Sequence, residues 1–278
     1  MNGKTDMKIK SLDLRTEFLC HMPDSNFADR GEYLVIGTPS NPTFWCGNCL
    51  LFKNPPQAGD YKRWMAIFLE ELKIPEDRHR VFYIDSPDGD SGCTQEFLAN
   101  GFEVETHDVL SLDANGFRPC DSALPELSFR TVNTDPEWAA LVTMSCLTAC
   151  ADKAQGTGPG YEDYLRLRMD SYRAKSRRGE GAWWAAFLDD KPVADMGLYF
   201  AEGLGRFCAV ETHPDYRRKG ICRTLLSTVC ADAFAAGRAE TLVIMPEDGP
   251  VRRIYESVGF AFRERSVCIM RAPAAGGS

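Results

Sequence analysis

The sequence predicts a mixed α/β fold built from two similar halves. Segments rich in β-branched and aromatic residues alternate with segments of helical periodicity. The stretch Phe97–Phe102 (FLANGF) matches the pattern of Tyr255–Phe260 (YESVGF) at an offset of about 158 residues, and a strand with a Pro-containing turn precedes each. A linker rich in Asp, Asn, Gly, Ser and Pro lies at 113–125. We therefore expect two domains, at residues 1–125 and 126–278, related as diverged repeats.

Composition indicates an ordinary globular protein. The chain has 278 residues, 44% of them hydrophobic, which is enough for ordinary cores. No stretch approaches the roughly 20 apolar residues that a membrane-spanning helix needs, and Met1–Lys10 is too polar for a signal peptide. The 11 cysteines are odd in number and irregularly spaced, which favours reduced thiols over a disulfide framework. We expect a cytoplasmic protein with no membrane partner.

Charge is distributed unevenly along the chain. The whole net charge of −8 lies in residues 1–125, because acidic and basic residues balance in the rest. An acidic half disfavours nucleic acid as a partner and mildly favours a cationic or amine substrate. Solubility alone is the competing explanation.

The first half alternates strands and helices. Strand patterns at 33–38 and 43–52 are separated by a Pro-Ser-Asn-Pro turn. An apolar stripe predicts a helix over 60–72, a strand follows at 80–85, a short helix ends at Gly101, and a strand covers 102–112.

Two cysteines in this half have the spacing of metal or redox sites. Cys46 and Cys49 form a C-x-x-C pair within an apolar strand pattern. His21, His79 and His107 are scattered, so no second pair completes a ligand set. We expect structural thiols and no metal site.

The second half predicts a longer series of elements. Pro136 falls in the first turn of the first helix, where proline is favoured. The expected order is a strand at 127–132, helices at 135–150 and 161–178, strands at 182–188, 192–200 and 206–212, a helix at 220–236, a strand at 241–245, a helix at 250–257 and a strand at 262–270.

The stretch Ala209–Leu226 (AVETHPDYRRKGICRTLL) is the most informative part of the chain. A strand enters a Pro turn, passes three basic residues and Gly220, and continues as an amphipathic helix. The first N–H groups of a helix have no internal partner, and they add to the helix dipole and the nearby cations. The pattern therefore predicts a site for a phosphate or pyrophosphate, which Gly220 lets approach the backbone.

Residues Arg217–Cys222 (RRKGIC) resemble the Arg/Gln-x-x-Gly-x-Gly/Ala signature of the GCN5-related N-acetyltransferases, the GNAT superfamily. In that family the turn holds the pyrophosphate of acetyl-CoA. Cys222 replaces the final Gly or Ala, and we expect this small, usually buried residue to be tolerated. The element order over 127–271 is also that of the family. The resemblance implies tandem GNAT-like domains, each a mixed, mostly antiparallel sheet flanked by helices.

The resemblance also implies which residues bind acetyl-CoA. The strand end at Val210–Thr212 is expected to pair with the pantetheine arm, and the N–H groups of 218–223 to bind the pyrophosphate. Asp248 stands where the family often has an Asn that contacts pantetheine. The expected set is Val210, Thr212, Arg217, Arg218, Lys219, Gly220, Ile221, Cys222, Arg223 and Asp248.

Three residues are candidates for proton transfer. Tyr255 lies four residues before Gly259 and matches the general-acid position of the family, and a phenol stays protonated at neutral pH. Val210 and Thr212 share one face of their strand, so Glu211 points to the other, where Asp195 could face it. Either carboxylate is a candidate general base, and either could instead bind a cationic substrate or act through water.

The first half resembles a GNAT lobe that has lost its chemistry. Where the second half has its basic loop, the first has Pro56–Asp60, without a cation and with a carboxylate that would repel a pyrophosphate. Phe97 holds the place of Tyr255 and has no proton to give.

The sequence thus favours an acetyl-CoA-dependent N-acetyltransferase. Acetyl-CoA is the expected cosubstrate, and the acceptor is the primary amine of a small molecule or peptide. Two alternatives stay open: an acyl-CoA-binding sensor without turnover, and a structural dimerisation protein that binds no CoA. The sequence has no readable code for the acceptor or the oligomeric state, and a homodimer is compatible with it.

Overall fold

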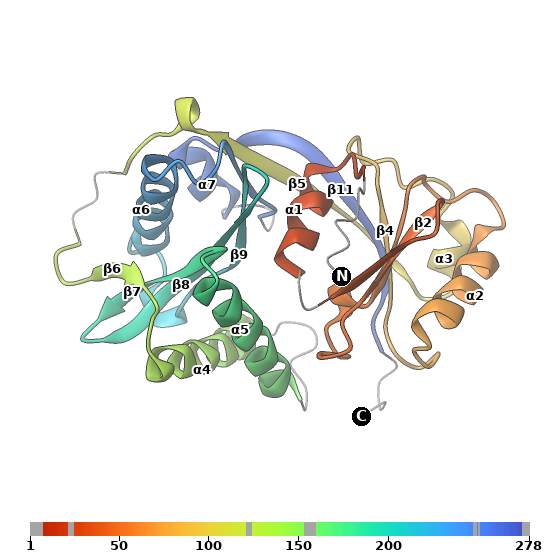
Figure 1. Cartoon of the computed structure of the whole chain (residues 1–278), viewed down its shortest axis with the longest axis horizontal. Helices are drawn as coiled ribbons and strands as arrows, with labels where there is room; N and C mark the ends of the chain where they lie inside the picture. The colour runs from red at the N-terminus through yellow and green to blue at the C-terminus, as the bar shows by residue number, and fades with distance from the viewer. Residues whose placement is uncertain are drawn as a thin grey trace. The chain divides into compact units, whose positions relative to one another are not determined.

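The chain forms two compact units, and the first consists of two segments that are far apart in the sequence. The computed structural model (Figure 1) describes residues 8–21, 25–120, 124–152, 160–246, 249 and 251–273. One unit comprises Met1–Val109 with Arg263–Ser278, and the other Leu110–Phe262. This division differs from the expected boundary at 125/126, because two long strands, β5 (Glu103–Asp113) and β11 (Ala261–Arg271), each belong partly to both units.

The first unit is a sheet covered by helices on both faces. Its strands run in the order β1-β2-β3-β4-β11, with β3 and β4 parallel and the other pairs antiparallel. One face packs on α1 through Leu14 and Phe18, and the other packs on α2 and α3 through Trp64, Phe68 and Phe97. The elements are α1 (Leu12–His21), β1 (Asn26–Asp29), β2 (Tyr33–Gly37), β3 (Cys49–Phe52), α2 (Asp60–Leu72), β4 (Arg80–Ile84) and α3 (Gln95–Ala99).

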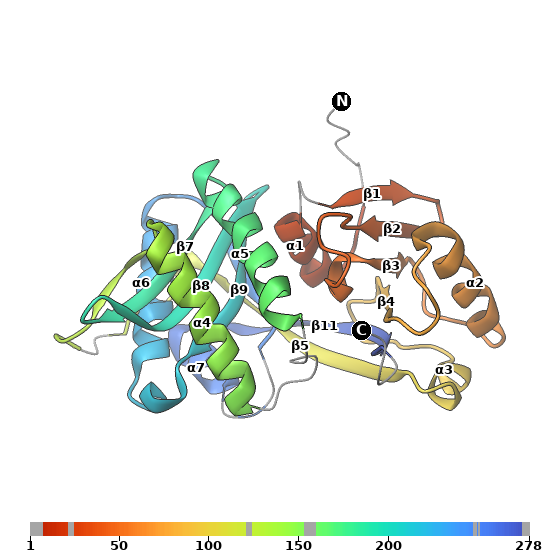
Figure 2. The same ribbon diagram turned by 90° about the horizontal axis from the view of Figure 1, so that it is seen from below.

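The second unit has the same kind of architecture. Its strands run in the order β5-β10-β9-β8-β7-β6, and only β9 and β10 are parallel. Helices α4 and α5 cover one face and α6 the other, as Figure 2 shows from below. The elements are β6 (Ser128–Thr131), α4 (Asp135–Asp152), α5 (Tyr161–Arg177), β7 (Gly181–Leu188), β8 (Lys191–Ala201), β9 (Leu204–Thr212), α6 (Ile221–Ala235), β10 (Thr241–Ile244) and α7 (Arg252–Val258).

The strand after each unit's last helix completes the sheet of the other unit. β5 follows α3 of the first unit, and its residues Leu110–Asp113 pair with β10 of the second. β11 follows α7 of the second unit, and its residues Val267–Arg271 pair with β4 of the first. The series β3-α2-β4-α3-β5 thus repeats as β9-α6-β10-α7-β11, which confirms the mixed α/β fold with an internal repeat.

Two parts of the first half differ from expectation. The strand expected at 43–52 forms only over Cys49–Phe52, since residues Trp45–Gly47 form a short 3₁₀ helix. Asn48 holds this turn, because its side-chain amide donates to the carbonyls of Asn41 and Phe44. Helix α1 and strand β1 were not expected, because neither segment has a clear periodicity.

The cysteine pair at this turn has structural surroundings. The Cys49 thiol donates to the Cys46 carbonyl at 3.2 Å, and burial raises the pKa of Cys49 well above its usual range. Among the residues that the structure describes, no group of three or more His, Cys, Asp or Glu side chains could hold a metal ion.

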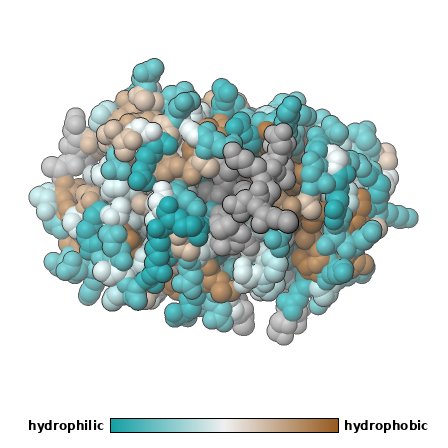
Figure 3. All heavy atoms as spheres, viewed as in Figure 1, coloured by the Kyte–Doolittle hydropathy of each residue, from teal (hydrophilic) through white to brown (hydrophobic). Residues whose placement is uncertain are grey.

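The exposed surface is mostly polar. On the face drawn in Figure 3, hydrophobic residues form small separated patches among hydrophilic ones. Within the described ranges, no helix combines the length and the apolar character required to cross a bilayer.

Candidate functional site

In the turn between β9 and α6, several backbone N–H groups lack a backbone hydrogen-bond partner among the described residues. Gly220 precedes α6 at φ 81°, and Arg218 is also left-handed at φ 61°. Among the described residues, no backbone acceptor is found for the N–H groups of 218–223, whereas the next N–H, that of Thr224, donates to the Gly220 carbonyl. A helix start with this many open donors is suited to an anion. The structure also leaves space there, because a Cβ added to Gly220 would meet nothing within 4 Å.

Basic side chains surround this turn. Arg217–Gly220 are exposed, and the Lys219 ammonium lies 4.8 Å from the centre of the Tyr216 ring. The Arg217 guanidinium is engaged by both carboxylate oxygens of Asp152 at 2.7 Å and donates to the Thr212 carbonyl. Arg217 therefore ties the turn to the end of α4, and Arg218, Lys219 and Arg223 are the basic residues closest in sequence to the open N–H groups.

Cys222 is accommodated in the first turn of α6. Burial raises the pKa of its thiol to about 11, while the Thr212 side chain slightly opposes this effect. A thiol with such a pKa is neutral at physiological pH and leaves the positive end of the helix unchanged. The neighbouring Ile221 is buried in the core of the second unit, which anchors the start of the helix.

Strands β9 and β10 separate beside this turn. They pair in parallel over Thr241–Val243 with Leu204–Arg206, and among the described residues this pairing does not extend to residues 209–212 of β9. On its other side β9 has a β-bulge, where Ala209 and Val210 lie opposite the single residue Met196. Ala209 adopts φ 43° there. The edge of β9 that leads to the turn is therefore available to an extended ligand.

The bulge sets two acidic residues opposite each other. Asp195 of β8 pairs with Glu211 of β9 in the register, and residues paired in this way project to the same face of the sheet. Asp195 is fully buried, and its Oδ2 accepts a 3.1 Å hydrogen bond from the Trp183 indole. Burial first, and the charge of Glu211 second, raise the pKa of Asp195 well above its usual range. Burial likewise raises the pKa of Glu211.

Helices α4 and α5 add polar groups on this face. The Ser145 hydroxyl of α4 lies close enough to Glu211 to favour its charged form, although the geometry is not that of a hydrogen bond. Thr148 lies one turn further along the same side of α4, and both hydroxyls are buried. Tyr161, at the start of α5, has its pKa raised by burial and then by the charge of Glu211. No sequence pattern around these three residues predicts a role for them.

Tyr255 lies inside the core of the second unit. It belongs to α7, is 2% exposed, and packs edge to face on Phe260 with ring centres 5.9 Å apart. Asp248, expected to contact pantetheine, lies outside the described residues.

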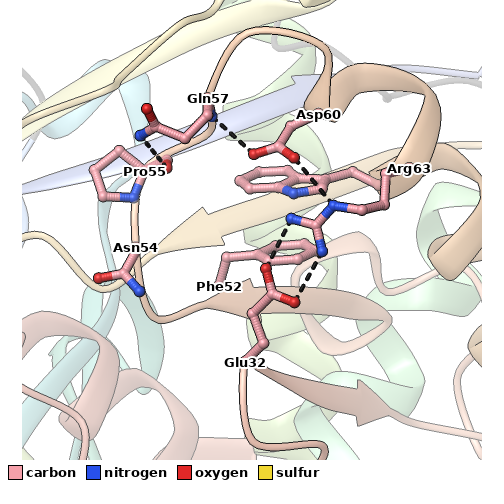
Figure 4. A pocket seen from close by; sticks show the side chains of 8 residues that line it. Glu32, Phe52, Asn54, Pro55, Gln57, Asp60 and Arg63 are labelled. Carbon is pink, nitrogen blue, oxygen red and sulfur yellow. Dashed lines mark hydrogen bonds and ion pairs between the residues drawn. The ribbon is translucent and has the colours of Figure 1, made fainter.

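The equivalent turn of the first unit already contains an anion. Asp60 begins α2, and its Oδ2 accepts the N–H of Gln57 at 2.8 Å (Figure 4). The Arg63 guanidinium bonds Asp60 and both oxygens of Glu32. These residues line a cavity of about 390 Å³ together with Phe52, Trp64 and their neighbours. A carboxylate thus lies at the start of α2, where the corresponding turn of the second unit has basic side chains.

Comparison with known proteins gives a family match for part of the chain. A model of the acetyltransferase (GNAT) family matches residues 148–260. The chain contains a GNAT domain. This domain includes β9, the turn, α6, β10 and α7. The matched stretch also holds Asp195, Glu211 and Tyr255. A search of curated proteins gave no significant match.

Solved structures extend the likeness to both halves. A functionally unknown conserved protein from Staphylococcus epidermidis ATCC 12228 has a TM-score of 0.70 at 10% identity, over 90% of this chain and 95% of that one. A GCN5-related N-acetyltransferase from Kribbella flavida has a TM-score of 0.66 at 15% identity, over 98% and 97%. A tandem GNAT protein from the clavulanic acid biosynthesis pathway has a TM-score of 0.55 at 11% identity, over 94% and 88%. At these identities the likeness concerns the fold, and the expected tandem GNAT architecture is confirmed.

Proposed function

We propose that the protein is an acetyl-CoA-dependent N-acetyltransferase and that its GNAT domain is catalytic. The observation that carries this proposal is the row of open N–H groups at residues 218–223, beside the unpaired edge of β9. Those donors would bind the pyrophosphate, with Arg218, Lys219 and Arg223 contributing charge and Gly220 the close approach. Val210 and Thr212 would pair with the pantetheine amides as an added strand. Asp248 stays a candidate for a further contact with pantetheine.

The transfer itself needs two proton movements. The amine nitrogen forms a bond to the thioester carbonyl carbon, the bond from that carbon to sulfur breaks, and the products are an amide and CoA thiol. Glu211, with Asp195 opposite it, would accept the proton that the amine loses, directly or through water. Tyr255 would donate a proton to the departing sulfur, which its protonated state allows. Direct transfer requires no covalent intermediate on the enzyme.

The test is to incubate the protein with acetyl-CoA and a panel of amines. Turnover is measured as the release of free CoA thiol. Wild type should bind acetyl-CoA and transfer its acetyl group to at least one amine. Gly220→Glu should lose binding, because its carboxylate would enter the anion site. Binding without transfer to any amine would instead favour an acyl-CoA sensor, and absence of binding would refute the assignment of the turn.

A further inference from the structure

Four buried polar atoms without hydrogen bonds gather on one face of the GNAT domain. Across the described part of the chain, eight buried side-chain nitrogen or oxygen atoms lack a hydrogen-bond partner. Four of these belong to one group: Asp195 Oδ1, Glu211 Oε2, Ser145 Oγ and Thr148 Oγ1. We call this group the acceptor cluster. Its members meet because Asp195 and Glu211 are opposed on β8 and β9, and α4 packs on those strands with Ser145 near Glu211.

The acceptor cluster offers mainly hydrogen-bond acceptors. Both carboxylate oxygens can only accept hydrogen bonds when ionised, and the two hydroxyls can accept as well as donate. None of the ion pairs found between described residues includes Asp195 or Glu211. The charge of Arg217 acts on Glu211, but the Arg217 guanidinium is bound by both carboxylate oxygens of Asp152. Buried acceptors left in this state are costly, so they indicate a ligand that brings donors and positive charge.

We propose that the acceptor is a short aliphatic amine with a second hydrogen-bond donor at its other end, such as a diamine or an amino alcohol. This inference rests on the proposed N-acetyltransferase function. The reacting amine would lie at Glu211 and Asp195, beside Ser145. The second donor would reach Thr148, one turn further along α4. Tyr161 would contact the aliphatic chain between them. An amino acid of similar length is a poor fit, because its carboxylate would meet buried acceptors and like charge.

Three acceptors with the same four-carbon chain test this directly. Diaminobutane and aminobutanol each offer a second donor, whereas aminobutyrate carries a carboxylate in its place. With acetyl-CoA saturating, we expect kcat/KM for the first two to exceed that for aminobutyrate by about 100-fold. Equal values for the three acceptors, or a preference for aminobutyrate, would overturn the inference while the transferase function stood. Transfer to no amine, with acetyl-CoA still bound, would defeat both proposals and favour a sensor.

A pair of variants on α4 tests the role of the hydroxyls. Thr148→Val removes the buried hydroxyl and should raise KM for diaminobutane and aminobutanol about tenfold, with kcat and the acetyl-CoA affinity little changed. The matched control is Thr143→Val, on the exposed side of the same helix, where the hydroxyl only donates to the Ala139 carbonyl. If internal water alone satisfied Thr148, the valine variant would keep the wild-type KM and the inference would fail. Thermal melting of both variants separates lost binding from lost folding.

Discussion

Asp195 and Glu211 lie directly opposite each other on antiparallel strands, immediately before the bulge at Ala209 and Val210. Burial raises the pKa of both carboxyls, and the charge of Glu211 raises that of Asp195 further. Two such groups release their protons in separate steps that belong to the pair. A carboxylate whose pKa is raised is a stronger base for the proton of an ammonium or a water molecule.

The pH profile of turnover should respond to Asp152. The charge of Asp152 raises the pKa of Glu211, whereas the charge of Arg217, which Asp152 holds, lowers it. Asp152→Asn removes the first effect, so Glu211 should lose its proton at lower pH, and we expect the acidic limb of kcat/KM to move down by about 1 pH unit. The control is Asp189→Asn, in the exposed turn between β7 and β8. An unchanged limb for Asp152→Asn, with Glu211→Gln inactive, would show that the charge of Asp152 does not act on the catalytic Glu211.

Tyr255→Phe should lower kcat about 100-fold or more, because the departing thiolate would lose its proton donor. Phenylalanine can keep the ring packed on Phe260, and thermal melting of the variant separates a loss of catalysis from a loss of stability. Tyr216→Phe, in the turn before α6, is a suitable control. A Tyr255→Phe variant with wild-type kcat would remove the residue from the mechanism.

Gly220 and Gly59 form a matched pair for testing the anion site. Each precedes a helix in the left-handed region, at φ 81° and φ 86°, and neither has an atom within 4 Å of an added Cβ. Glutamate at either position should therefore cost a similar backbone strain, about 1 kcal/mol. Only Gly220→Glu should abolish acetyl-CoA binding by calorimetry. Equal effects of the two substitutions would place the ligand elsewhere.

His79 should make the stability of the protein depend on pH. It is 3% exposed, its Nε2 lies 3.1 Å from the Asn48 carbonyl oxygen, and burial lowers its pKa to about 4. The unfolded chain takes up a proton near the ordinary value of 6.5, so the neutral folded form loses stability as the pH falls from 6.5 towards 4. We expect that loss to reach about 3 kcal/mol.

The measurement is urea unfolding over this pH range. The wild-type free energy of unfolding should fall by about 3 kcal/mol more than that of His79→Gln, whose amide carries no charge. Parallel curves for wild type and His79→Gln would contradict the assignment.

The second half was predictable because its signals are local. The helix over 161–178 appeared as Tyr161–Arg177, and the strand at 206–212 as Leu204–Thr212. Gly220 and the basic residues before it marked the turn in advance. The opposition of Asp195 and Glu211 also followed from strand alternation, although a bulge intervenes that no residue pattern announced.

The features that the sequence could not predict depend on contacts between residues far apart in the chain. In the sequence, Ser145 and Thr148 look like ordinary residues of a core helix. Only the packing of α4 on β8 shows that their hydroxyl groups are buried without hydrogen-bond partners. The one available signal was their polarity among the buried positions Leu141, Val142 and Ala149. The partners of β5 and β11 were equally hidden, since each pairs with a strand of the other repeat.

This reciprocal pairing limits where the chain can be truncated and affects how it folds during synthesis. An expression clone that stopped at residue 125 would lack β11 beside β4, and one that started at 126 would lack β5 beside β10. Each fragment would expose a bare strand edge, which invites aggregation. During synthesis on the ribosome, the sheet of the N-terminal repeat likewise stays incomplete until β11 has emerged.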